Sequence, residues 1–130
     1  IGDLIKISYQ KNNTMKSIFV SWLKNESTKY LKARVSILSK KKKIDAQSVF
    51  VKTYRARWGS CSHKSEIFLN WKLFLLPKGI IDYVIAHELA HILVPNHSKK
   101  FWSTVEQIDP NYREKKDWLR VHGYAYIQFN

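Results

Sequence analysis

The segment Pro77–His97, PKGIIDYVIAHELAHILVPNH, contains the most strongly apolar helical pattern of the chain. Its apolar side chains recur at the spacing of an α-helix. They are Ile80, Ile81, Val84, Ile85, Leu89, Ile92 and Leu93. Pro77 suits the first turn of a helix, where a backbone N–H has no partner within the helix, and Pro95 stops the helix. We therefore predict a central helix between the two prolines, with its apolar residues in the core.

Within this helix, residues 87–91 form an H-E-x-x-H sequence. Residues four positions apart lie about 40° apart around a helix and about 6 Å apart along it, so both imidazoles reach one point. Burying such groups without partners would cost about 2–7 kcal/mol each, and metal coordination removes that cost. We predict that His87 and His91 bind Zn²⁺ and that Glu88 acts as general base toward the zinc-activated water. The alternative is a pair of hydrogen-bonded core histidines beside an exposed Glu88.

The predicted third zinc ligand is His97, six residues after His91. Catalytic zinc sites have three protein ligands and one position for water. The histidine spacing is that of H-E-x-x-H-x-x-G-x-x-H metzincins, although Val94 stands at the glycine position and no methionine follows. Two alternatives remain: His97 has a capping role or is exposed to solvent beside Ser98, or Glu106 replaces or supplements it as a ligand.

The sequence gives weaker support for a functional role of other titratable or reactive residues. His63 is expected at a hairpin tip and His122 near a helix end, both in structural or exposed positions. Cys61 is interpreted as a small strand residue, because no dedicated base is evident for it. Asp82 suits the first turn of the central helix, and it is also a candidate partner for a metal-binding histidine. Arg57 or a tyrosine is a candidate for stabilising an oxyanion.

Three further helical segments are predicted. Residues 14–38 carry apolar side chains at helical spacing and form a long amphipathic helix. The lysine run Lys40–Lys43 ends it and begins a solvated linker. Ser98 is a candidate N-cap for the next helix. The last helix begins at Asp109–Pro110 and is expected to end at Gly123.

Four segments carry strand patterns. Leu4–Tyr9 alternates apolar and polar residues, and Val49–Trp58 is rich in β-forming residues. Ser60–Ser62 and Ile67–Leu69 flank a hairpin tip, and with Val49–Trp58 they predict a small antiparallel sheet. The expected fold class is therefore α+β, with a long N-terminal helix, the H-E-x-x-H helix and two C-terminal helices.

Length and composition predict a single domain over residues 1–130. The chain has 130 residues, of which 45% are hydrophobic and 14% aromatic, which suffices for one core. No window approaches the ~18 apolar residues of a membrane-spanning helix, and no secretory signal is visible. Because one cysteine excludes an internal disulfide framework, we expect a reducing, cytoplasmic location. The chain begins at Ile1 rather than Met, which we interpret as a truncated N-terminus.

The sequence resembles the YgjP-like metallopeptidases over about Thr14–Gly123. The resemblance rests on motifs that follow one another in the family's order: Arg57–Ser62 (RWGSCS), Leu69–Trp71, Pro77, Ile81–Val84, His87–His91, and Asn96–Ser98 with Phe101–Trp102. It implies a zincin-like catalytic domain, related to SprT-like and WLM metallopeptidases. It also implies zinc ligation by His87, His91 and His97, with Glu88 as the general base.

The zincin analogy also predicts where the substrate binds. In such folds an edge strand beside the metal-binding helix pairs with an extended peptide. Arg55–Ser62 is the candidate for that strand, with Gly59 either allowing close backbone approach or forming a bulge. We therefore expect a zinc-dependent peptidase acting on a peptide or protein.

Two other functions remain open at this stage. The net charge of +13 attracts polyanions, which favours a nucleic-acid-associated protease acting on DNA-bound proteins. The second is a metal-binding domain without catalysis, in which Glu88 has no role.

Overall fold

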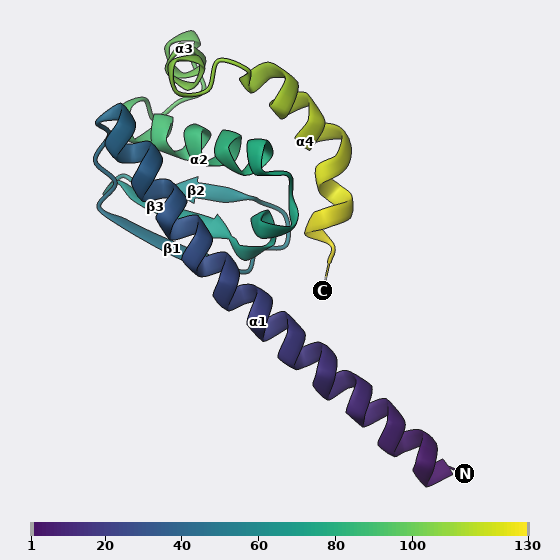
Figure 1. Ribbon diagram of the computed structural model, residues 1–130. Helices are drawn as coiled ribbons and strands as arrows, with labels where there is room; N and C mark the ends of the chain where they lie inside the picture. Colours follow the sequence, from purple (N-terminus) through teal and green to yellow (C-terminus); the bar gives the residue numbers. More distant parts are fainter. Residues whose placement is uncertain (1, 130) are drawn as a thin grey trace.

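Four α-helices, one 3-10 helix and one three-stranded sheet make up the part of the chain that the structure describes. The computed structural model describes the backbone of residues 2–129 and the side chains of residues 13–129 (Figure 1). In chain order the elements are α1 (Gly2–Lys42), β1 (Ser48–Lys52), β2 (Gly59–Cys61), β3 (Glu66–Asn70), η1 (Trp71–Leu75), α2 (Lys78–Leu93), α3 (Lys99–Ile108) and α4 (Tyr112–Ile127). The predicted α+β class is confirmed.

The sheet has the strand order β1-β3-β2, and it is mixed rather than antiparallel as predicted. β1 runs parallel to β3, pairing Ser48 with Glu66, whereas β2 runs antiparallel to β3, pairing Gly59 with Leu69. β3 is the central strand, and its side chains Ile67 and Leu69 are fully buried on one face of the sheet. The short β2 is left at the edge, beside α2.

The helix α2 is the buried axis of the domain. It contacts β2, η1, α1, α3 and α4, and nine of its sixteen residues are buried. Because other elements pack against α2 on several sides, its sequence is apolar around the whole helix instead of along one stripe. The helix begins at Lys78 after Pro77 and ends at Leu93, before Pro95, as the two prolines predict.

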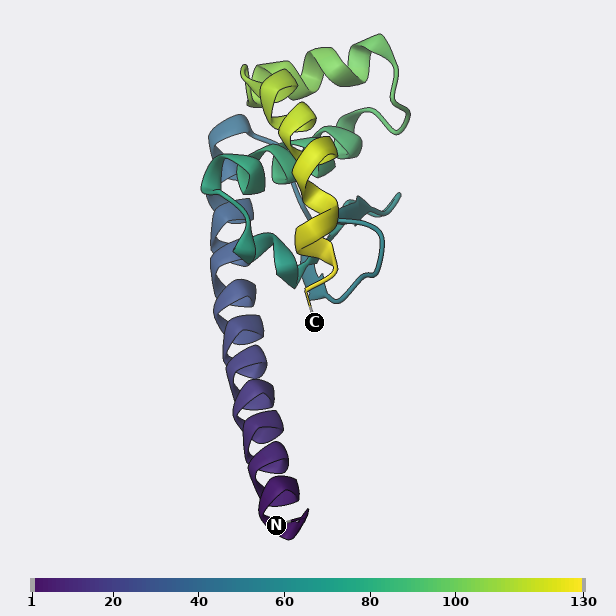
Figure 2. The same ribbon diagram turned by 90° about the vertical axis from the view of Figure 1, so that its right-hand side faces the viewer.

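The N-terminal helix α1 is longer than predicted and includes residues 4–9. The strand predicted for Leu4–Tyr9 is therefore wrong. A strand needs a neighbouring strand for its backbone hydrogen bonds, whereas a helix makes them within itself. The N-terminal half of α1 extends away from the sheet, so no strand partner is at hand (Figures 1 and 2). Lys40–Lys42 form the last turn, where cations are favourable, and Lys43 adopts a left-handed φ of 56°.

The two C-terminal helices cover one side of α2. Ser98 caps α3 as predicted, since its side chain accepts a hydrogen bond from the N–H of Phe101. The predicted end of the last helix at Gly123 is wrong, because α4 continues to Ile127. A Cβ at Gly123 would lie 3.2 Å from the indole Nε1 of Trp58, so the glycine allows close packing instead of ending the helix.

Candidate metal centre

Three histidine side chains converge at the C-terminal end of α2. His87 and His91 project from α2, and His97 comes from the loop that leads into α3. The Nε2 atom of His97 lies 3.1 Å from that of His91 and 3.4 Å from that of His87. Zinc–nitrogen bonds of 2.0–2.1 Å in a tetrahedral site place the ligand nitrogens about 3.3 Å apart. The three rings therefore have the spacing of ligands to a single metal ion.

The protonation of these rings also suits a metal ion. His91 Nδ1–H donates a hydrogen bond to the carbonyl oxygen of Val94 at 3.2 Å, which leaves the Nε2 lone pair facing the other two histidines. Burial lowers the pKa of His87 to about 4, with smaller contributions from the other histidines and Lys116. Burial likewise lowers the pKa of His91. Neutral imidazole is the form that binds metals.

A buried aromatic side chain supports all three imidazoles. The ring centroid of Phe101 lies 5.0 Å from that of His87, 4.4 Å from that of His91 and 5.0 Å from that of His97. Phe101 itself is completely buried in the first turn of α3. From the sequence, Phe101 was named only within the motif Phe101–Trp102 of the family resemblance and was given no role at the site.

Glu88 lies beside the histidines against the edge strand. Its side chain is buried, with the residue 5% exposed, and a Cβ built on Gly59 would lie 3.1 Å from its carboxylate Oε2. Gly59 therefore leaves room for the Glu88 carboxylate, a role that differs from the predicted approach of substrate. Burial raises the pKa of Glu88 to about 8, and the positive charge of Arg57 opposes this rise.

A cleft of about 520 Å³ opens over these groups. Its wall is formed by β2 and the following turn, residues 59–63 with Ser65, and its floor by the three histidines and Glu88. The free edge of β2 thus borders the site, and the regular strand covers Gly59–Cys61 within the predicted Arg55–Ser62. His63, at the predicted turn, also lines the cleft.

The loop before β2 is held by Asn70, whose role was not predicted. The Asn70 side-chain amide donates to the carbonyl oxygens of Tyr54 and Arg57, each at 3.1 Å. Its backbone N–H donates to the carbonyl oxygen of Trp58 at 2.9 Å. Asn70 is completely buried, so these bonds set where the loop ends and Gly59 begins.

Comparison with known families identifies the family of the chain. The family model of the YgjP-like metallopeptidase domain matches residues 2–122. The chain belongs to the YgjP-like metallopeptidase family. Membership makes the protein a peptidase that uses a catalytic metal and acts on a protein or peptide. The three-histidine group is the candidate for the metal site.

Solved structures share the fold of this family member. The metallopeptidase zymogen abylysin of Pyrococcus abyssi is 22% identical, with a TM-score of 0.62 over 70% of this chain and 92% of that one. The zymogen jannalysin of Methanocaldococcus jannaschii is 20% identical, with a TM-score of 0.61 over 70% and 94%. The search of curated proteins found no match.

None of the helices in the described residues is long and apolar enough to cross a membrane.

The remaining predicted residues of this metallopeptidase lie outside the group of three histidines. Glu106 lines a neighbouring pocket between α3 and α4, and the His122 ring is tilted against the Trp118 ring, with centroids 4.9 Å apart. Asp82 neither caps α2 nor contacts a histidine ligand, because its carboxylate forms a bidentate ion pair with Arg34 of α1 at 2.7 and 2.8 Å. Val94 has φ −135° and ψ 105°, which any residue adopts, so this chain needs no glycine there.

Proposed function

We propose that the protein is a zinc-dependent peptidase in which His87, His91 and His97 hold the metal. The observation that carries the proposal is the convergence of the three Nε2 atoms, at 3.1 and 3.4 Å, in the family's H-E-x-x-H context. Zinc, when bound, lowers the pKa of a water molecule to about 7 and polarises a carbonyl group. Catalytic zinc sites can consist of three nitrogen ligands, as proposed here.

Glu88 is the proposed general base. It follows the first histidine ligand in the helix, and its carboxylate reaches the same cleft. Because the carboxylate is buried, it is poorly solvated and readily takes a proton from water at the site. The same carboxyl group then delivers this proton to the leaving amine of the cleaved peptide bond.

The substrate's backbone is proposed to bind along β2. This strand pairs with β3 on one side, and the N–H and C=O groups of its other edge are available to an extended peptide. Arg57 precedes the strand on an exposed loop, and we propose it for stabilising negative charge on the scissile carbonyl oxygen.

Zinc content and peptide hydrolysis, measured on the same preparations, test this function. We expect the wild-type protein to bind one zinc per chain and to hydrolyse peptides. His97→Ala should lower the zinc content, and Glu88→Gln should keep zinc while losing at least about 100-fold in kcat. His122→Gln removes a histidine outside the cluster and should change neither quantity.

Two outcomes would reject the proposal. Full zinc occupancy in His97→Ala would exclude the three-histidine site. Unchanged hydrolysis in Glu88→Gln would exclude Glu88 as the base. A protein that binds zinc but hydrolyses no peptide would instead be the non-catalytic metal-binding domain. The single-domain organisation and the cytoplasmic location stay predictions.

A further inference from the structure

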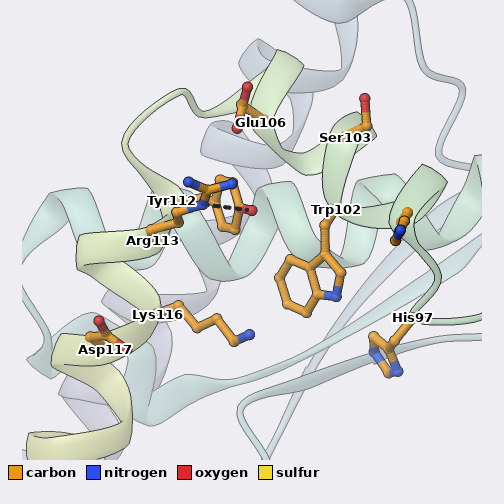
Figure 3. A pocket seen from close by; sticks show the side chains of 9 residues that line it. His97, Trp102, Ser103, Glu106, Tyr112, Arg113, Lys116 and Asp117 are labelled. Atoms are coloured by element: carbon orange, nitrogen blue, oxygen red, sulfur yellow. Dashed lines mark hydrogen bonds between the residues drawn. The ribbon is translucent and has the colours of Figure 1, made fainter.

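A second pocket, of about 690 Å³, lies next to the metal centre, between α3 and α4 (Figure 3). His97 lines both this pocket and the cleft over the metal centre. The other lining residues are Lys99, Trp102, Ser103, Glu106, Tyr112, Arg113, Lys116 and Asp117. A peptide bound over the metal centre can therefore place one of its groups in the second pocket.

Aromatic rings connect the pocket to the metal centre. The Trp102 indole lies nearly parallel to the Tyr112 ring, with centroids 5.5 Å apart, and to the His97 ring, with centroids 6.1 Å apart. An extended peptide advances about 3.3–3.6 Å per residue. The step from His97 to Trp102 thus corresponds to about two residues of bound peptide.

Lys116 and Arg113 contact aromatic side chains in this pocket, and the negative charge of Glu106 also acts on Arg113. Lys116 Nζ lies 4.0 Å from the centroid of the Trp102 ring, and Arg113 Nε donates a hydrogen bond to the Tyr112 hydroxyl at 3.2 Å. Within the described residues, neither cation forms an ion pair with a carboxylate. An aromatic face does not neutralise an ammonium group, so Lys116 can still bind an anion.

The acidic groups at the pocket do not cancel these charges. Glu106 and Asp117 line the wall together with three cations, Lys99 being the third. Asp117 lies 3.9 Å from Arg120, a residue outside the lining, and both side chains are 74% exposed. The pocket lining therefore carries a net positive charge.

We propose that this pocket binds a carboxylate of the peptide substrate, with Lys116 as its main partner. The proposal rests on the proposed peptidase function and specifies its substrate class. A carboxylate accepts charge-assisted hydrogen bonds from ammonium and guanidinium groups, which are stronger than bonds between neutral groups. The carboxylate can belong to a Glu or Asp side chain or to the peptide's C-terminus, because both carry the same chemistry.

The test uses matched peptides with the zinc-loaded protein. An N-acetylated peptide library carries either Glu or Gln at each position in turn, and each peptide has a free or an amidated C-terminus. We expect kcat/KM to be about tenfold higher for peptides with a suitably placed carboxylate. A preference that follows Glu identifies the side chain as the source. A preference that follows the free C-terminus identifies the terminal carboxylate.

Two variants decide whether the pocket is responsible. Lys116→Met keeps an unbranched chain over the indole but removes the charge, and it should reduce the tenfold preference to less than about twofold. Lys100→Met removes a charge from α3 outside the pocket and should keep the preference. Equal rates for Glu and Gln peptides with the wild-type protein, or an unchanged preference in Lys116→Met, would overturn the proposal.

Binding separates this proposal from the proposed function. The affinities of the same peptides for the zinc-loaded Glu88→Gln protein are measured by isothermal titration calorimetry. If the wild-type protein cleaves none of the peptides, the peptidase function fails, but tighter binding of carboxylate peptides still supports the pocket. Equal affinity for the carboxylate and amide peptides would overturn the pocket even if the protein hydrolyses peptides.

Discussion

At the residue scale, Gly59 determines how much room the Glu88 carboxylate has. A Cβ at this position would lie 3.0 Å from the carbonyl oxygen of Phe68 and 3.1 Å from Glu88 Oε2. Gly59→Ala should therefore displace Glu88 and lower kcat at least about tenfold, since displacement of about 1 Å costs up to about 100-fold. It should also destabilise the fold by about 1–3 kcal/mol, while zinc content stays unchanged. Hydrolysis rates, thermal denaturation and elemental analysis measure the three effects.

Gly79 provides the matched control on α2. A Cβ there would meet Lys115 Cε at 3.5 Å, an ordinary contact, so Gly79→Ala should leave hydrolysis unchanged. It should raise the free energy of unfolding by up to about 1 kcal/mol, because alanine has a higher helix propensity than glycine. If both alanine variants keep full activity, Gly59 does not position Glu88.

The thiol of Cys61 has a pH dependence that follows from its environment. Burial and the nearby Glu88 carboxylate raise the pKa of Cys61 from 9.0 to about 11. A raised pKa keeps the thiol protonated, and only the thiolate reacts with iodoacetamide. At pH 8 the folded protein should react about 100-fold more slowly than the protein unfolded in guanidinium, with the rate rising up to about pH 11. Equal rates at pH 8 would contradict the raised pKa.

At the scale of elements, the Arg34–Asp82 ion pair joins α1 to α2. The two side chains are 31% and 25% exposed and form two hydrogen bonds at 2.7 and 2.8 Å. Asp82→Asn should lower the free energy of unfolding in urea by about 1–2 kcal/mol, because it leaves a half-buried guanidinium without a charged partner. Zinc content should not change, since neither side chain belongs to the histidine cluster.

The exposed pair Glu26–Lys29 offers a comparison within α1. Its atoms are 3.7 Å apart and its side chains are 37% and 76% exposed. Glu26→Gln should change the free energy of unfolding by less than about 0.5 kcal/mol, because water screens exposed charges. Equal losses of unfolding free energy in Asp82→Asn and Glu26→Gln would show that the Arg34–Asp82 pair stabilises the fold no more than the exposed pair.

The helices were more predictable than the strands. The pattern of α2 and the Ser98 cap of α3 are local signals, and helix hydrogen bonds form between near neighbours. Alternation over Leu4–Tyr9 was misleading, because a strand needs a partner that the sequence does not reveal. The parallel pairing of β1 with β3 also depends on which hairpin strand becomes central. Gly123 looked like a helix end because only tertiary packing shows that Trp58 requires a small residue there.

At the scale of the whole molecule, the net charge of +13 leaves nucleic acid as an alternative partner, against a basic surface that is simply solvated. If nucleic acid is a partner, the protein binds duplex DNA of random sequence at low salt. The logarithm of its affinity should fall linearly with the logarithm of salt concentration, by about 0.9 per phosphate neutralised. Electrophoretic mobility shift measurements at several salt concentrations check this, with an acidic protein of similar size as control. No binding at low salt would remove nucleic acid from the candidate partners.

The sequence alone indicated the candidate metal centre, because residues 87–91 lie on one helix and His97 follows after a short turn. These residues lie close together because of local helix geometry, and the spacing of residues in the sequence is enough to predict that geometry. Only the tertiary structure showed Phe101 beneath the three imidazoles, Gly59 against Glu88, and the charged pocket next to His97. Gly59 and Glu88 belong to segments that are distant in the chain. Phe101 reaches the two histidines of α2 from another helix, and the pocket brings α3 and α4 together. Such contacts arise from the packing of whole elements, which no local spacing specifies.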